Sequence, residues 1–126
     1  MRERQSNLVQ FQGRFELHEV AVGLRTRSVE FGWEETGRYG GIRRPLGKSM
    51  QVPCVDSNEV LDKVIMRHGN VDILKIDIEA LEPDLVERLP RSLARRIKRI
   101  YVESKFIRNP LAQTHSYRQR GSMATF

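Results

Sequence analysis

Three charged side chains alternate with apolar ones in residues 71–79 and could together perform acid–base chemistry. Lys75, Asp77 and Glu79 are spaced two residues apart, so in a β-strand they would share one face. A carboxylate placed there can take a proton from a hydroxyl group, or hold a divalent cation that binds the hydroxyl. The alternative is an ion-pair network in which Lys75 only neutralises Asp77. The local pattern leaves both interpretations open.

The strand that must position these groups is predicted over residues 71–78. Five of its eight residues are apolar, which is typical of a strand covered on both faces in a parallel sheet. Ligands of parallel sheets bind beyond the carboxyl ends of the strands. Glu103 closes another predicted strand, at residues 98–103, so we expect its carboxylate at the same level as Asp77. Glu82 follows at the start of the next helix.

The helix before this strand has the clearest boundaries in the sequence. Asp56 has the properties of an N-cap, and Glu59, three residues later, would complete a capping box. Gly69 suits the C-terminal end of the same helix. A one-sided apolar stripe between them is typical of a helix packed on a sheet; it comprises Val60, Leu61, Val64 and Ile65.

The order of the remaining elements predicts an α/β fold with parallel strands. A second helix is predicted after the central strand, where leucines recur at every fourth position until Pro90 ends the helix. Residues 32–48 show no periodicity and are predicted to form a long loop. Further strands are predicted at residues 15–22, 28–31 and 51–55.

The composition is that of one globular domain in a reducing compartment. The chain has 126 residues, of which 39% are hydrophobic and 30% charged, and a single cysteine rules out an intrachain disulfide. We predict a cytoplasmic protein, because residues 2–7 are polar and no apolar run reaches the ~18–20 residues of a membrane span. The net charge of +6 raises nucleic acid as a partner. Few aromatic residues accompany the basic ones, which makes that partner a minor alternative.

Residues 72–82, with the sequence DILKIDIEALE, resemble the signature of the FkbM-type methyltransferases. The resemblance covers about residues 15–126. It implies a Rossmann-like class I methyltransferase fold and methyl transfer from S-adenosylmethionine to a hydroxyl of a sugar or another natural product. Flanking segments that resemble family strands and loops are residues 19–23, 37–42, 52–55, 99–103, 115–117 and 123–126.

The resemblance also implies roles for individual residues. Asp77 would orient or deprotonate the acceptor hydroxyl, either directly or through a divalent cation that it ligates. Glu79 would assist, and Lys75 would hold Asp77 in its ionised form. Tyr39, in a glycine-containing loop, and His115, near the substrate end of the family fold, would contact the acceptor.

Two departures from the family pattern predict a partial domain. Ala80 stands where the family usually carries glycine, and a positive φ there would cost an alanine roughly 1 kcal/mol. No G-x-G precedes the matched region, so the first strands and the cofactor loop of the fold are missing. We therefore expect a C-terminal part of a longer enzyme, which binds S-adenosylmethionine weakly or not at all without its N-terminal half. The alternatives are a non-catalytic remnant or interaction module, and a small nucleic-acid-binding domain.

Overall fold

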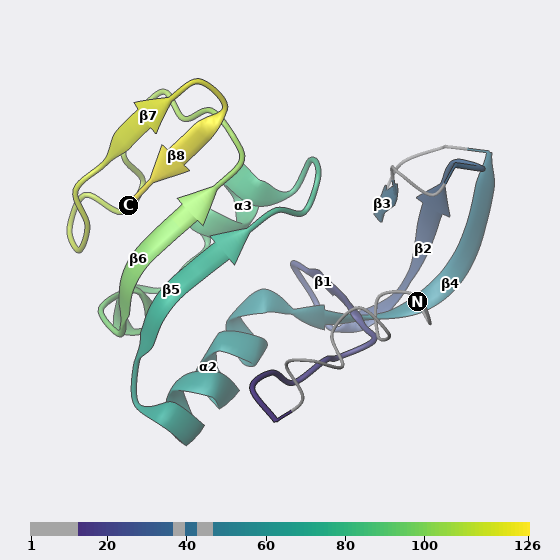
Figure 1. Ribbon diagram of the computed structural model, residues 1–126, viewed down its shortest axis with the longest axis horizontal. Helices are drawn as coiled ribbons and strands as arrows, with labels where there is room; N and C mark the ends of the chain where they lie inside the picture. The colour runs from purple at the N-terminus through teal and green to yellow at the C-terminus, as the bar shows by residue number, and fades with distance from the viewer. Residues whose placement is uncertain (1–12, 37–39, 43–46) are drawn as a thin grey trace.

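The structure of the protein is a computed structural model that describes residues 13–36, 40–42 and 47–126 (Figure 1). Strands account for 37% of it and helices for 21%. The strands form two mixed four-stranded sheets. The predicted Rossmann-like α/β methyltransferase fold is therefore wrong, because that fold is rich in helices and is built around one mainly parallel sheet.

The first sheet has the strand order β1-β4-β2-β3. Its strands are β1 (Ala21–Gly23), β2 (Arg27–Trp33), β3 (Gly40–Ile42) and β4 (Lys48–Asp56). β1 is parallel to β4, but β2 is antiparallel to both β4 and β3. The strands predicted at 28–31 and 51–55 are confirmed, whereas the one predicted at 15–22 is wrong for most of its length, since β1 begins at Ala21. β3 lies within the predicted loop.

The antiparallel pairing of β2 with β4 is one physical reason why the parallel prediction fails. The two strands pair over seven positions, from Arg27 opposite Cys54 to Trp33 opposite Lys48. Val29 is buried in β2 while Ser28 and Glu30 beside it are exposed, which is the alternation of a sheet with one solvated face. The described residues between these strands form only the short strand β3, and an antiparallel pair needs no crossover helix.

Helix α2 (Ser57–His68) follows β4 directly and confirms the predicted helix. Asp56 caps it by accepting a hydrogen bond of 2.8 Å from the Asn58 backbone N–H. Gly69 ends it with a φ of 83°. A bridge through Thr26 takes the place of the capping box expected between Asp56 and Glu59. The Thr26 hydroxyl accepts from the Asp56 backbone N–H and donates to the Glu59 carboxylate. None of the residues of α2 is buried.

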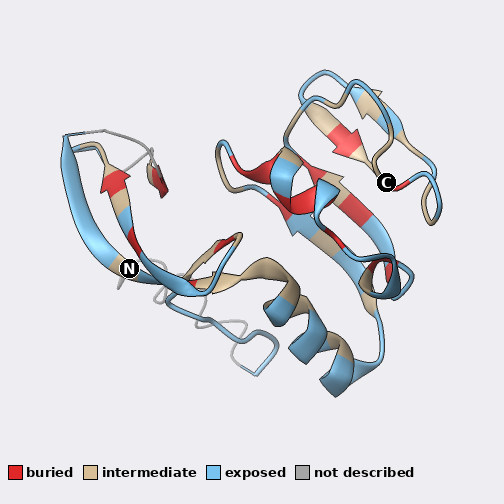
Figure 2. Cartoon of the chain, turned by 180° about the vertical axis from the view of Figure 1, so that it is seen from behind, coloured by how far each residue is buried: buried red, intermediate tan, exposed pale blue. Residues whose placement is uncertain are grey.

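The second sheet has the strand order β5-β6-β8-β7. Its strands are β5 (Val71–Ile76), β6 (Ile97–Val102), β7 (Arg118–Arg120) and β8 (Met123–Thr125). β5 and β6 are parallel, and the other pairs are antiparallel. Helices α3 (Glu82–Glu87) and α4 (Arg91–Ala94) connect β5 to β6. Seen from behind, α3 lies in front of the sheet and contributes buried residues to the core (Figure 2).

The core of the second sheet lies on the face that α3 covers. Ile100, Val102 and Ala124 are fully buried there, together with Val86 of α3. β5, by contrast, is an edge strand, and Ile73 at its centre is 63% exposed. The prediction that this strand is covered on both faces is therefore wrong, because the face that carries Ile73 is open to solvent among the described residues.

Arg88, at the C-terminal end of α3, connects the two sheets. Its guanidinium donates to the Leu24 carbonyl oxygen and lies 3.4 Å from the Asp56 carboxylate. The Arg88 carbonyl in turn accepts a hydrogen bond of 3.2 Å from the Asn58 side chain. α2 lies between the sheets in Figure 1.

Over the described residues, the longest helices are too short and too polar to cross a membrane.

Candidate functional site

Two carboxylates stand together where the parallel strands β5 and β6 end. Asp77 follows β5 and Glu103 follows β6. Ile76 is the register partner of Val102, and the Glu103 backbone N–H donates to the Ile76 carbonyl at 3.3 Å. The two acidic residues therefore leave the sheet side by side, as the sequence predicted.

Lys75 binds Asp77 and sets its charge. The Lys75 Nζ lies 2.8 Å from Oδ2 of Asp77, and both side chains are about half exposed. The hydrogen bond and the charge of Lys75 lower the pKa of Asp77, with a smaller contribution from a hydrogen bond with Glu103. The same hydrogen bond raises the pKa of Lys75. Asp77 is thus an ionised hydrogen-bond acceptor at neutral pH, open to solvent on one side.

Glu79 lies apart from this arrangement. β5 ends at Ile76, so the strand alternation that would place Glu79 on the face of Lys75 and Asp77 stops before it. Glu79 is half-buried in the turn that leads to α3, and Glu82, the first residue of that helix, is buried. The structure brings Lys75, Asp77 and Glu103 together.

Ala80 has a positive φ, the conformation in which an alanine is expected to be strained. Its φ is 76°, and it is the only non-glycine residue with a positive φ in the described ranges. Replacing Ala80 with glycine should therefore raise the free energy of unfolding by about 1 kcal/mol, because glycine adopts this conformation without a Cβ clash. Denaturation by urea measures the change.

The control is Ala112→Gly, in an exposed turn where φ is not positive. It should leave stability unchanged or lower it by up to about 1 kcal/mol, since glycine there only gains freedom in the unfolded chain. Stabilisation by both substitutions, or by neither, would show that Ala80 is not strained.

The two predicted acceptor contacts do not join the carboxylates. Tyr39 lies outside the described residues. The ring of His115 is held at both nitrogens: Nε2 donates to the Ile97 carbonyl at 2.8 Å, and Nδ1 shares a hydrogen bond of 2.9 Å with the Thr114 hydroxyl. Ile97 begins β6 and Glu103 follows its end, so His115 lies roughly 20 Å from the carboxylates along the strand.

The predicted cation ligand, Asp77, has too few neighbours of the right kind. Within the described ranges no group of three or more His, Cys, Asp or Glu side chains is placed to hold a metal ion. Asp77 and Glu103 supply carboxylates from two residues only. A divalent cation would have to take most of its ligands from water or from the acceptor itself.

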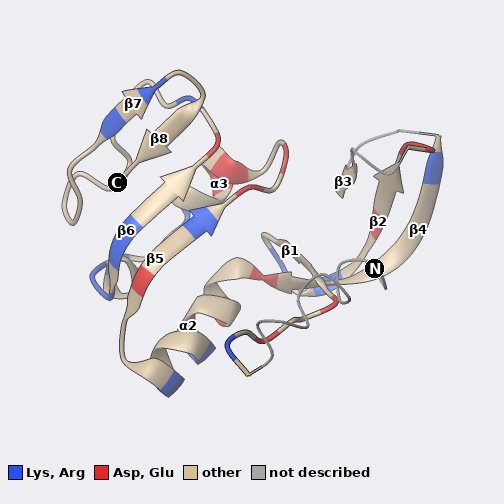
Figure 3. Cartoon of the chain, viewed as in Figure 1, with Lys and Arg blue, Asp and Glu red and all other residues tan. Residues whose placement is uncertain are grey.

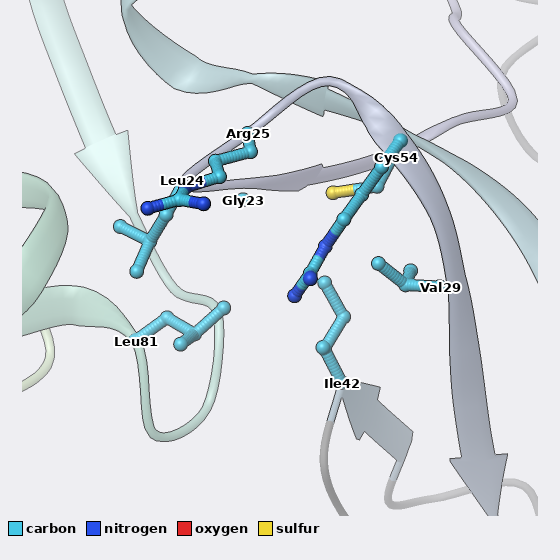
Figure 4. A pocket seen from close by; sticks show the side chains of 8 residues that line it. Gly23, Leu24, Arg25, Val29, Ile42, Cys54 and Leu81 are labelled. Carbon is cyan, nitrogen blue, oxygen red and sulfur yellow. The ribbon is translucent and has the colours of Figure 1, made fainter.

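Two cavities near the sheets are mainly apolar. One, of about 190 Å³, lies between α2, β5 and α3, and Lys75 forms part of its wall. The other, of about 20 Å³, is shown in Figure 4 and is lined by Cys54, Gly23 and Leu81. A Cβ on Gly23 would come within 2.8 Å of the Cys54 sulfur. Burial raises the pKa of the Cys54 thiol, so this cysteine packs as an apolar side chain.

Sequence reasoning did not anticipate one polar feature of the second sheet. Arg99 of β6 and the pair Arg118 and Arg120 of β7 come from separate parts of the sequence but line one hollow on the face opposite α3. The usable signal was Arg118-Gln119-Arg120, in which alternate residues of a strand are basic. Only the pairing of β8 with both β6 and β7 brings these residues together.

Comparison with protein-family models, curated proteins and solved structures gives no match to this chain. The resemblance to the FkbM-type methyltransferases therefore stays an expectation that depends on the quoted residues.

Proposed function

We propose that this chain forms the acceptor side of a cytosolic, S-adenosylmethionine-dependent O-methyltransferase that acts on a sugar or another small hydroxyl-bearing molecule. One observation carries the proposal: Asp77 and Glu103 meet at the ends of two parallel strands, with Lys75 bound to Asp77. The positive φ of Ala80 supports the FkbM resemblance, since the family usually carries glycine at that position.

Asp77 acts on the hydroxyl group of the acceptor. Its ionised carboxylate accepts a hydrogen bond from the hydroxyl and takes the proton as the oxygen becomes a nucleophile. Glu103, whose backbone is tied to the end of β5, is the second carboxylate within reach of that proton. Lys75 favours the charged form of Asp77 and fixes its position. The methyl group itself would come from S-adenosylmethionine.

The described residues do not fit the whole methyl donor. The cavity of about 190 Å³ between α2, β5 and α3, which neither Asp77 nor Glu103 lines, is smaller than the ~300–1,000 Å³ of typical small-molecule sites. Its lining contains no carboxylate that could bind a positively charged sulfonium, and the side chain of Lys75, which contributes to the wall, is bound to Asp77. The buried Asn58 Oδ1, another wall group with no hydrogen-bond partner among the described residues, offers only one acceptor. We propose that another polypeptide segment binds the donor.

Titration of the purified chain with S-adenosylmethionine should therefore show no saturable heat below a concentration of about 1 mM. Isothermal titration calorimetry measures this directly. Micromolar binding would contradict the assignment of the donor site to another segment, although it would leave the role of Asp77 open to separate test.

The proposed reaction is tested on the chain as it occurs in its own cell. The chain is tagged, isolated with the polypeptides bound to it, and supplied with methyl-labelled S-adenosylmethionine and a small-molecule extract of the same cells. Label should appear in a small hydroxyl compound. Absence of transfer from an isolate that contains the chain and its bound polypeptides would contradict the proposal.

A non-catalytic interaction module is the second candidate, and the open edge of β5 favours it. β5 pairs with β6 alone among the described strands, and Ile73 on it is 63% exposed. Exposed apolar edges of this kind favour pairing with another strand. This candidate predicts an isolate with a bound polypeptide but without methyl transfer, which is the result that separates the two functions.

A further inference from the structure

One face of the second sheet is free of helices and carries polar side chains. In Figure 1 this face points toward the viewer, with α3 behind it. Lys75, Tyr101, Thr125 and Arg118 form a row across all four strands, since each is the register partner of the next. The residues one position further along, such as Val102 and Ala124, are buried on the opposite face. The row therefore belongs to a solvent-facing surface.

A hollow of about 750 Å³ lies on this face, beside the first half of β6. Four cationic side chains line it: Lys98, Arg99, Arg118 and Arg120. Figure 3 shows basic residues along β6 and β7. No Asp or Glu side chain is part of the lining, and of the four cationic side chains only Lys98 has an acidic side chain as its partner, Asp72 at 2.7 Å. The three guanidinium groups thus have no Asp or Glu partner among the described residues.

The walls of the hollow are fixed by internal hydrogen bonds, whereas some of its donors are uncommitted. Tyr117 donates to the Phe106 carbonyl and stacks on Phe126, with 5.2 Å between the ring centroids. His115 uses both ring nitrogens within the fold. The Tyr101 hydroxyl, by contrast, only accepts a 3.4 Å contact from Arg99. Its proton and the guanidinium groups are therefore available to an incoming acceptor.

We propose that this hollow binds the phosphate group of a small phosphorylated molecule. Guanidinium groups bind phosphate oxygens through paired, charge-assisted hydrogen bonds. Tyr101 is the register partner of Lys75, which binds Asp77, so a ligand held here reaches toward the two carboxylates. The inference deepens the proposed function, and to that extent rests on it: the methyl acceptor is a phosphate ester that keeps a free hydroxyl.

The size and the aromatic content of the hollow favour a small molecule over a polynucleotide. Its volume is within the range of ~300–1,000 Å³ that is typical of small-molecule sites. Single-stranded nucleic acid would need a row of rings on which successive bases stack. Here Tyr117 is already stacked on Phe126, and the ring of His115 is held by hydrogen bonds at both nitrogens, which leaves Tyr101 as the remaining aromatic ring of the lining.

The inference is tested by binding alone, with inorganic pyrophosphate and glucose 1-phosphate as probes and glucose as the phosphate-free comparison. Both phosphates should bind in a calorimetric titration, more weakly as ionic strength rises, and glucose should not. The double variant Arg99→Gln/Arg118→Gln should weaken binding at least about tenfold. Circular dichroism checks that the variant is folded.

The matched control is Arg91→Gln/Arg95→Gln, which removes the same charge from exposed positions of α4 and the residue that ends it. It should bind both phosphates as the wild type does. Equal weakening by both double variants, or no binding of either phosphate to the wild type, would overturn the inference. Tight binding of an oligothymidylate that exceeds that of the phosphates would overturn it as well. None of these results depends on methyl transfer, so the inference and the proposed function can fail separately.

Discussion

Replacing Asp77 with asparagine should reduce methyl transfer at least about 100-fold, the usual contribution of a general base, when the chain is isolated with the polypeptides bound to it. Asparagine keeps the size of the side chain but cannot accept the hydroxyl proton. The fold should be unaffected, because the side chain of Asp77 is 45% exposed and its ion pair with Lys75 is open to solvent. Transfer of label from S-adenosylmethionine measures the loss.

The control for this substitution is Asp72→Asn, on the strand that Asp77 follows. Asp72 is 81% exposed, near the opposite end of β5, and binds Lys98 rather than Lys75. Its replacement changes the net charge by the same amount and should leave transfer within about twofold of the wild type. Equal activity of the two variants would remove Asp77 from the reaction.

Replacing Ile100 with alanine should lower the free energy of unfolding by about 3 kcal/mol, the largest stability effect that we expect. Ile100 is fully buried, and its backbone N–H and C=O both pair with Phe126 at 2.9 Å. Neither solvent nor a neighbouring strand can fill the space that the side chain leaves, so its removal creates a cavity. Urea denaturation followed by circular dichroism measures the change.

Ile73→Ala is the matched control for this prediction, because Ile73 lies on the adjacent strand but is 63% exposed. It should cost less than about 1 kcal/mol. A similar loss for both isoleucines would mean that the exposed face of β5 is covered in solution, and that the core does not lie on the α3 side alone.

The sequence predicted those parts of the fold that depend on local chemistry. The start of α2 follows from the side chain of Asp56, and its end follows from the positive φ of Gly69. Both features act within one turn of the helix. The meeting of Asp77 and Glu103 also followed, because each ends an apolar segment and parallel strands end on one side. The resemblance drew attention to Ala80 as a position that usually carries glycine, and the structure shows a positive φ there.

The parts that it could not predict depend on contacts between distant residues. Apolar density placed β5 inside a sheet, yet an edge strand and a central strand can have the same five apolar residues. The two short strands β7 and β8 offer only three residues each, too few for a periodic signal. Thr26, which joins Asp56 and Glu59, is about thirty residues away from both, so no local pattern reveals it.

The chemical identity of the labelled product tests the central claim most directly. Mass spectrometry and fragmentation of the compound that receives label from S-adenosylmethionine should locate the methyl group on a hydroxyl oxygen, as an ether, and the label should vanish with Asp77→Asn. Label on nitrogen or sulfur, or a methyl ether formed equally well by that variant, would contradict the role of the carboxylates at the ends of β5 and β6.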